Sequence, residues 1–326
     1  MEGLRRFSKL TCFSTLFLIF VGGMVTSTGS GLAVPDWPLS YGMLFPPMVG
    51  GIFYEHSHRM AAATVGLLTV GLVVGLGIRE KRRWVRLLGI WALAAVVAQG
   101  LLGGLTVLFL LPKPISISHG ILAQTFFVLT IIIAYSLSAE REIREFGEEG
   151  RRDPRFIKMA LLFTIIVYVQ LILGAIMRHT GSGLAIPDFP KMGGYWIPPF
   201  HEGMLSRIND WRFGHNLDPV RMGQVVTHFI HRVGALGIAV VLCFLNTFGF
   251  KYGIFNKKIF KTLLLLDSLV IVQLALGALT VLTYKSSLIT SFHVVTGAAV
   301  LGVCVLLFLR TAPLSMNSLK QELRLR

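Results

Sequence analysis

The chain has 326 residues, of which 54% are hydrophobic and only 14% are charged, and its mean hydropathy is +0.70. A soluble domain usually carries about 25% charged residues, so this composition argues against that class and favours a membrane protein. The formal net charge of +15 suggests nucleic-acid binding at first sight. The basic residues, however, gather beside apolar segments on one side, which is the pattern of membrane topology and argues against a nucleic-acid partner.

Apolar segments of roughly 20 residues, each long enough to cross a bilayer as a helix, recur along almost the whole chain. They cover residues 11–29, 52–77, 86–110, 115–137, 157–178, 222–246, 260–283 and 288–309. The first is too long for a removable signal peptide and is counted as a helix. The sequence therefore predicts an all-α integral membrane protein with eight transmembrane helices.

Most of the 31 Lys and Arg residues fall at the ends and loops of one side of these segments. The positive-inside rule then predicts a multi-pass protein of the inner (plasma) membrane with both termini in the cytoplasm. Cys12, Cys243 and Cys304 all fall inside predicted helices, so neither a disulfide nor a thiolate metal site is implied.

One unit is written twice in the sequence. The segment from Thr28 to Pro38 recurs from Thr180 to Pro190 with two conservative changes. The later helices repeat as well, since Gln99–Val107 aligns with Gln273–Val281. Each unit holds an even number of spans, so both units enter the membrane in the same direction. The repeat therefore predicts two pseudo-symmetric four-helix bundles, residues 1–150 and 151–326.

Small residues in the repeated helices, namely Gly103, Gly104 and Gly277, are interpreted as close helix contacts rather than ligand groups. The Thr-Gly-Ser-Gly-Leu segments are predicted to be turns at the outer surface.

Four histidines occupy matching positions in the two units and lie at a similar depth in the outer part of the membrane: His58, His119, His231 and His293. A single intramembrane histidine is as readily explained by a structural hydrogen bond, but four repeat-equivalent ones favour ligand binding. Two neutral imidazoles per bundle suit axial ligation of a haem iron. Zinc or copper more often recruits three or four close ligands that include cysteine or carboxylate, so haem is favoured over a bare metal.

Arg59 and Arg232 directly follow His58 and His231. Each is a candidate partner for a haem propionate, with snorkelling to the membrane surface as the alternative interpretation.

The two units differ at one chemically informative place, because Glu55 in the first aligns with His228 in the second. Glu55 lies one turn from His58 on the same helix face, where a carboxylate can donate or accept a proton beside a bound ring. The alternative is an interfacial glutamate that only orients the helix. The remaining histidines are expected to be solvated or interfacial: His56, His179, His201 and His215.

Taken together, these motifs resemble the heme A synthase family. The resemblance rests on both Thr-Gly-Ser-Gly-Leu segments, Glu55-x-x-His58-Arg59, His231-Arg232, His119, His293 and the paired Gln-x-x-x-Gly runs. It implies an enzyme that oxidises the C8 methyl group of heme O to a formyl group, making heme A for terminal oxidases.

In that family the pair matching His58 and His119 holds the substrate haem, the residue matching Glu55 is the essential acid, and the pair matching His231 and His293 holds a b-type haem cofactor. The implied partners are heme O, the lipid bilayer and an electron donor; heme O synthase and a second copy of the chain are further candidates.

Many bacterial relatives carry a cysteine pair in each outer loop, which this chain lacks, so no role of those thiols is transferred to it. A di-haem membrane cytochrome b that carries electrons fits the four histidines equally well, and a haem or solute transporter is a third class, for which parallel repeats are a common architecture.

Overall fold

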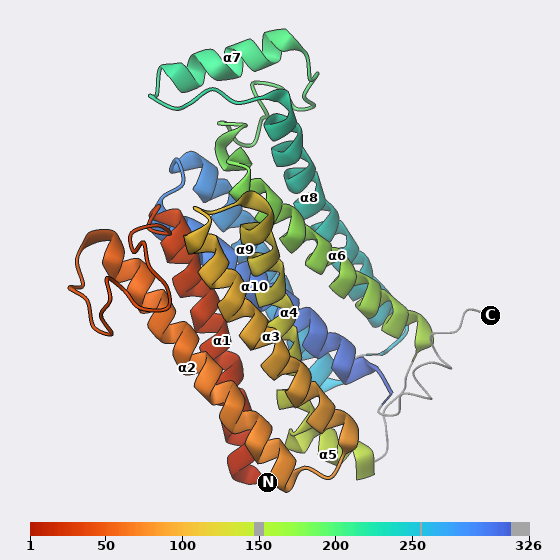
Figure 1. The fold of residues 1–326 in the computed structure, drawn as a ribbon. Coiled ribbons are helices and arrows are strands. Elements are labelled where there is room, and N and C mark those ends of the chain that lie inside the picture. Colours follow the sequence, from red (N-terminus) through yellow and green to blue (C-terminus); the bar gives the residue numbers. More distant parts are fainter. Residues whose placement is uncertain (147–152, 255, 314–326) are drawn as a thin grey trace.

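The computed structural model describes residues 1–146, 153–254 and 256–313, and within these residues it contains helices and isolated bridges but no β-strand (Figure 1). The helices are α1 (Glu2–Ser27), α2 (Gly50–Arg79), α3 (Arg83–Leu108), α4 (Lys113–Ser136), α5 (Ala139–Phe146), α6 (Pro154–His179), the 3₁₀ helix η1 (Ser182–Leu184), α7 (Glu202–Phe213), α8 (Met222–Lys251), α9 (Lys257–Leu282) and α10 (Ser287–Thr311).

Eight of these helices have the length and apolar composition needed to cross a membrane: α1 to α4, α6 and α8 to α10. The prediction of an all-α membrane protein with eight spans is confirmed. Several helices extend beyond the apolar segments, and α1 begins at Glu2 rather than near residue 11. Polar residues continue these helices outside the hydrocarbon region, where apolar runs no longer mark them.

The sequence interpretation missed α5, η1 and α7, which are short and carry no long apolar run. His201 caps α7 by accepting a hydrogen bond of 3.1 Å from the Met204 N–H. Met204 and Ile208 on this helix are buried against Ile186 and Val225, so α7 closes the second outer loop over the top of α8 (Figure 1).

Both halves pack their helices in the same order. In the first, α1 contacts α2, α2 contacts α3, α3 contacts α4 and α4 contacts α1. In the second half, α6 contacts α8, α8 contacts α9, α9 contacts α10 and α10 contacts α6. The two halves meet along α1, α4, α6 and α10. This order agrees with two four-helix units, whose pseudo-symmetry stays a prediction. The predicted boundary between residues 150 and 151 lies outside the described residues.

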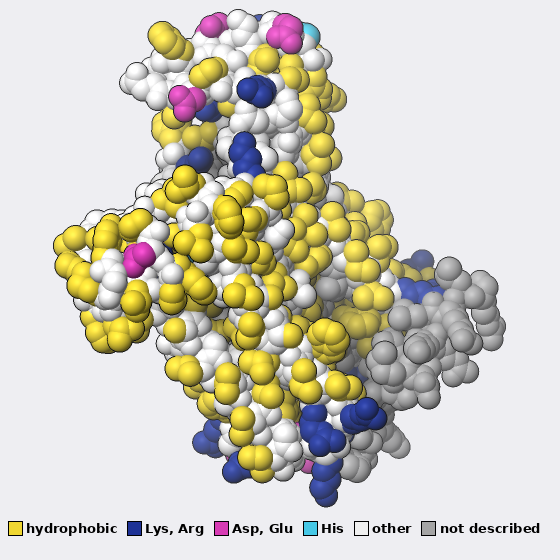
Figure 2. All heavy atoms as spheres, viewed as in Figure 1, with side chains coloured by type: hydrophobic (Ala, Val, Ile, Leu, Met, Phe, Trp, Pro, Cys, Tyr) yellow, Lys and Arg dark blue, Asp and Glu magenta, His cyan; other side chains and the backbone are white. Residues whose placement is uncertain are grey.

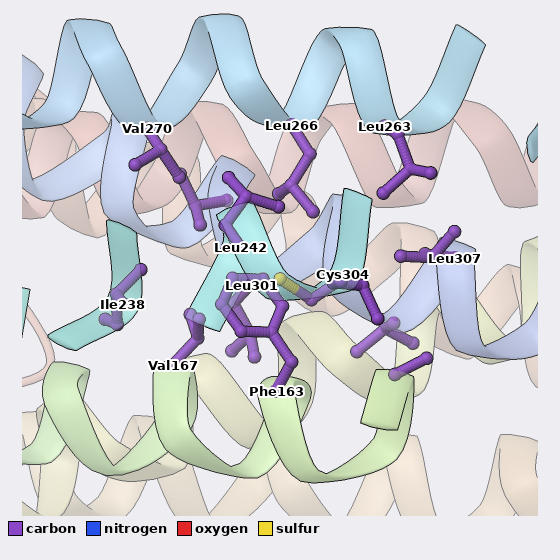
Figure 3. Packing of buried hydrophobic residues seen from close by; sticks show 14 of the residues in the cluster. Phe163, Val167, Ile238, Leu242, Leu263, Leu266, Val270, Leu301, Cys304 and Leu307 are labelled. Atoms are coloured by element: carbon purple, nitrogen blue, oxygen red, sulfur yellow. The ribbon is translucent and has the colours of Figure 1, made fainter. Parts of the chain in front are cut away.

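The largest apolar core lies between the helices of the second half. Phe163 and Val167 of α6 face Leu242 of α8, Leu266 of α9 and Leu301 of α10 (Figure 3). Because lipid is as apolar as these side chains, close packing rather than escape from water stabilises such a core.

The described segments that are predicted to be cytoplasmic lie at one end of the bundle. The N-terminus and α5 are at this end (Figure 1). Arg5 donates to the Leu137 carbonyl, and Arg310 forms a two-point ion pair with Glu140 at 2.8 and 2.9 Å. Lys and Arg side chains mark this end below a broad apolar surface (Figure 2). The assignment of this end to the cytoplasm stays a prediction, and the basic residues at 151, 152 and 314–326 lie outside the described residues.

Candidate haem sites

The four predicted histidines lie on α2, α4, α8 and α10, each within about the first three turns of its helix. These helix starts all belong to the end of the bundle that carries the outer loops 28–49 and 180–221 (Figure 1). The structure thus places His58, His119, His231 and His293 at one end of the membrane region.

Each of these imidazoles lies against a glycine of the preceding membrane helix. A Cβ built on the glycine would lie 3.0 Å from Cε1 of His58 at Gly22, 3.5 Å from that of His119 at Gly103, 3.3 Å from that of His231 at Gly174, and 3.1 Å from that of His293 at Gly277. The four glycines are themselves repeat-equivalent, Gly22 with Gly174 and Gly103 with Gly277. Glycine therefore provides the space in which each ring sits.

The interpretation of Gly103, Gly104 and Gly277 as pure helix contacts needs refinement. Gly103 and Gly277 accommodate a histidine ring, and a Cβ on Gly104 would lie 2.8 Å from the Trp37 indole of the outer loop. Gly22 and Gly174 were not singled out from the sequence, although their repeat spacing could have identified them.

The rings of His231 and His293 have centroids 6.5 Å apart with an interplanar angle of 75°. A metal–imidazole bond is about 2 Å long and the ring centroid lies about 1 Å further, so two axial imidazoles on one iron have centroids roughly 6 Å apart. The centroid distance of the second pair is close to this value, and ligation of a haem iron by the pair stays a prediction. His58 and His119 lie within electrostatic range of each other.

Three of the four rings have a buried nitrogen that makes no hydrogen bond of good geometry in the described part of the chain. The Nδ1 atoms of His58, His119 and His293 are buried and make no hydrogen bond of good geometry within the described residues. Such groups are rare in native interiors, and each of these Nδ1 atoms lies within 4.0 Å of a Cβ built on the glycine that faces its ring. The fourth ring is supported by Gln170, whose Nε2 lies 3.1 Å from Nδ1 of His231 and donates to its carbonyl at 2.8 Å.

Glu55 is buried at the outer end of α2, where it joins this helix to the first outer loop. Its carboxylate accepts hydrogen bonds from the Val34 N–H at 2.9 Å and from the Arg59 guanidinium at 2.6 Å. An ion pair this well buried depends on such additional hydrogen bonds.

His228 takes the same structural place in the second half. The Ile186 N–H lies 3.1 Å from its Nδ1, and Nε of Arg232 lies 3.1 Å from its Nε2. Ile186 and Val34 are repeat-equivalent, as are Arg232 and Arg59. The second half thus has an imidazole where the first has a carboxylate, and the groups around this position are the same in both halves.

Both arginines hold the outer loops. Arg59 donates to the carbonyls of Asp36 and Leu39 at 2.7 and 2.6 Å. Arg232 donates to those of Lys191 and Ile186, each at 3.1 Å. The predicted contact of these arginines with haem propionates stays a prediction beside this visible role.

The first loop is further shaped by Asp36, which accepts hydrogen bonds from the N–H groups of Tyr41 and Gly42. These N–H groups, Gly42 first, hold the pKa of the Asp36 carboxyl below its ordinary value. Asp188 makes the equivalent contacts with Gly193 and Gly194 in the second loop.

One expectation about the other histidines was wrong. His56 is buried, and its Nδ1 lies 2.9 Å from the Ser40 hydroxyl, because the outer loop folds over the start of α2. His201 and His215 are exposed as expected, and His179 is half-buried at the end of α6.

A family model described as cytochrome oxidase assembly protein matches residues 5–50 and 48–305. The chain belongs to this family. The heme A synthase of Halalkalibacterium halodurans is 26% identical over 308 residues, which cover 90% of this chain and 91% of the relative. That of Rickettsia bellii is 25% identical over 341 residues, with 93% and 97% coverage. That of Bacillus licheniformis is 29% identical over 211 residues, with 62% and 68% coverage. The resemblance to heme A synthases is confirmed at the level of the family.

Proposed function

We propose that this membrane protein is a heme A synthase, an oxidoreductase that converts the C8 methyl group of heme O to a formyl group for use in terminal oxidases. The single observation that carries the proposal is the pairing of four glycine-backed histidines in two repeat-equivalent sets; among the described residues, only the first set has a buried carboxylate one helical turn from a ligand, Glu55. The proposed reaction is inferred from its similarity to relatives that are named heme A synthase.

In this proposal His58 and His119 bind the iron of heme O, the substrate, in the first half. His231 and His293 bind a b-type haem as a resident cofactor in the second half, which the 6.5 Å separation of their rings supports. Haem bound in this way would supply the one-electron and oxygen chemistry.

Glu55 is assigned the role of proton acceptor on the substrate side. It lies one turn outward from His58 on α2, and its carboxylate is already fixed by Arg59 and the Val34 N–H. A group held in this way needs no rearrangement before it accepts a proton. Arg59 and Arg232 are assigned to holding the outer loops over the two sites, with propionate binding as a further role.

The competing class is a di-haem membrane cytochrome b that carries electrons and leaves its haems unchanged. The histidine pairs alone fit both classes, whereas the buried carboxylate on one side only favours the enzyme. A haem or solute transporter is the third class, and it requires no stoichiometric resident haem.

Co-expression with a source of heme O, followed by extraction and mass spectrometry of the haems, separates these classes. Heme A or its hydroxylated intermediate is expected in the extract of the wild type and not in that of His58→Ala. Recovery of unmodified heme O and heme B alone would overturn the proposal and favour the electron carrier, and a protein purified without haem would favour the transporter.

We further propose that both termini face the cytoplasm in the inner membrane, as the distribution of basic residues indicates. An electron donor, heme O synthase and a second copy of the chain are the proposed protein partners.

A further inference from the structure

The outer mouth of the second half carries cations at positions where the first half has neutral residues. Arg178 near the end of α6 is repeat-equivalent to Thr26 of α1, and Lys285 between α9 and α10 is repeat-equivalent to Leu111. This difference is separate from the exchange of Glu55 for His228 and is not explained by helix packing alone.

The backbone conformation at Leu111 in the first half is the same as that at Lys285 in the second half. Leu111 and Lys285 have φ angles of 59° and 65°. The Leu111 side chain lies 3.4 Å from a Cβ built on Gly31, and that of Lys285 lies 3.7 Å from one built on Gly183, the equivalent glycine. The second half therefore keeps an apolar contact at this place, through the Cδ methylene of Lys285, and adds an ammonium group at the end of the same side chain without changing the fold.

Arg178 lies where the two halves meet. Its Nη2 donates to the Gly23 carbonyl at 2.7 Å and to the Ser27 hydroxyl at 3.0 Å. Both bonds use one nitrogen, so the Nε and Nη1 donors of this guanidinium have no hydrogen-bond partner within the described residues. Arg178 is also within electrostatic range of His293, a proposed ligand of the cofactor haem.

Lys285 and the nearby Arg212 add to the positive charge. Arg212 of α7 donates to the Leu184 carbonyl at 2.8 Å, directly beside the Gly183 that Lys285 touches. Burial lowers the pKa of the Lys285 ammonium, and the charges of Arg178 and Arg212 lower it further. In the described part of the chain, Arg178 and Lys285 form no ion pair with a carboxylate, whereas Arg212 lies within electrostatic range of Asp218. An oxyanion bound among them would relieve this repulsion.

We propose that Arg178 and Lys285 bind the propionate carboxylates of the haem in the second half and so retain it as a cofactor, whereas Thr26 and Leu111 let the first half release its haem as product. The inference rests on the proposed function, which it deepens by giving a physical reason why one haem stays and the other leaves. Charge-assisted hydrogen bonds to a carboxylate are among the strongest polar contacts that a protein makes.

The test exchanges each cation for its first-half counterpart, in Arg178→Thr, Lys285→Leu and the double variant. All are made in a His58→Ala background, so that haem is measured in the second site alone. Purified protein loaded with protohaem is mixed with excess apomyoglobin, and haem transfer is followed by absorbance. Each single variant is expected to lose haem roughly tenfold faster, and the double variant faster still. Arg207→Gln, which removes an exposed cation of α7, is the matched control and should leave the rate unchanged.

Protohaem dimethyl ester, in which both propionates are blocked, gives the second readout. The His58→Ala protein, in which Arg178 and Lys285 are intact, should release the ester about as fast as the double variant releases protohaem. Equal rates for protohaem in all variants would overturn the inference. Loss of co-purified phospholipid without a change in haem release would also overturn it, by assigning the site to a lipid phosphate.

Folding is controlled in two ways. Arg178→Lys keeps the charge and should restore slow release, and Lys285→Leu adopts a backbone conformation that Leu111 already has. Heme A formation by the wild type together with unchanged release in the variants would overturn this inference alone. Fast release in the variants from a protein that forms no heme A would overturn the proposed function alone.

Discussion

Arg59 donates a hydrogen bond of 2.6 Å to the Glu55 carboxylate one turn before it on α2. The same carboxylate accepts from the Val34 N–H, so it can satisfy both donors with its two oxygens. The His228 ring faces two equivalent donors, yet a neutral imidazole has only one acceptor nitrogen. The two halves thus share a scaffold but differ in the number of hydrogen bonds that the side chain at this position can accept.

Glu55→Gln should retain haem in both halves but lower heme A formation by roughly 100-fold or more, because it removes the proton acceptor and no iron ligand. The measurement is the ratio of heme A to heme O in extracts of the purified variant. His228→Gln is the matched control and should keep most of the conversion. Full turnover by Glu55→Gln would refute the assigned role.

Gly277→Val should displace His293, since a Cβ at this position already lies 3.1 Å from the ring. We expect the haem content of the second half to fall at least severalfold, as measured by the Soret absorbance per protein. Gly237→Val on α8 is the control, because nothing lies within 4 Å of a Cβ there. A normal haem content in Gly277→Val would show that the glycine is not needed to seat the ring.

His231→Ala and His293→Ala should each abolish the low-spin bis-histidine signal of the second half, because one axial ligand is lost. Electron paramagnetic resonance of the oxidised protein measures this signal. Removing His56, which is buried against Ser40 away from the proposed ligand set, should leave it in place. An unchanged signal in either ligand variant would contradict the assignment.

Phe163→Ala should destabilise the second half by about 3–5 kcal/mol, since Phe163 is fully buried between α6, α8 and α10 and its truncation leaves a cavity. Thermal unfolding in one detergent measures the change. Leu162→Ala alters the adjacent, 55% exposed side chain and should have little effect. Similar melting temperatures for the two variants would argue against this core.

The sequence predicted what depends on composition and repetition. The spans could be predicted because a membrane helix must be largely apolar where it crosses the hydrocarbon core, and the histidines could be predicted because they recur at matching places. Gly22 and Gly174 escaped notice because a glycine in a membrane helix is common and carries no sign of what it faces.

Features that depend on the path of the loops could not be predicted. From the sequence, Arg59 was a candidate partner for a haem propionate. Its hydrogen bonds to the carbonyls of Asp36 and Leu39 form because loop 28–49 folds back over α2. His56 was expected to be solvated or interfacial, and it is buried because the same loop covers it. The helix α7 is too short and too polar to stand out from the outer segment 180–221.

The central claim is tested most directly by supplying heme O and a chemical reductant to the purified protein in air and following the mass of the substrate haem. We predict a product that has gained one oxygen and lost two hydrogens at the C8 methyl group, formed by the wild type and not by Glu55→Gln. Substrate recovered unchanged, from a wild-type protein whose second haem is present and reducible, would contradict the account.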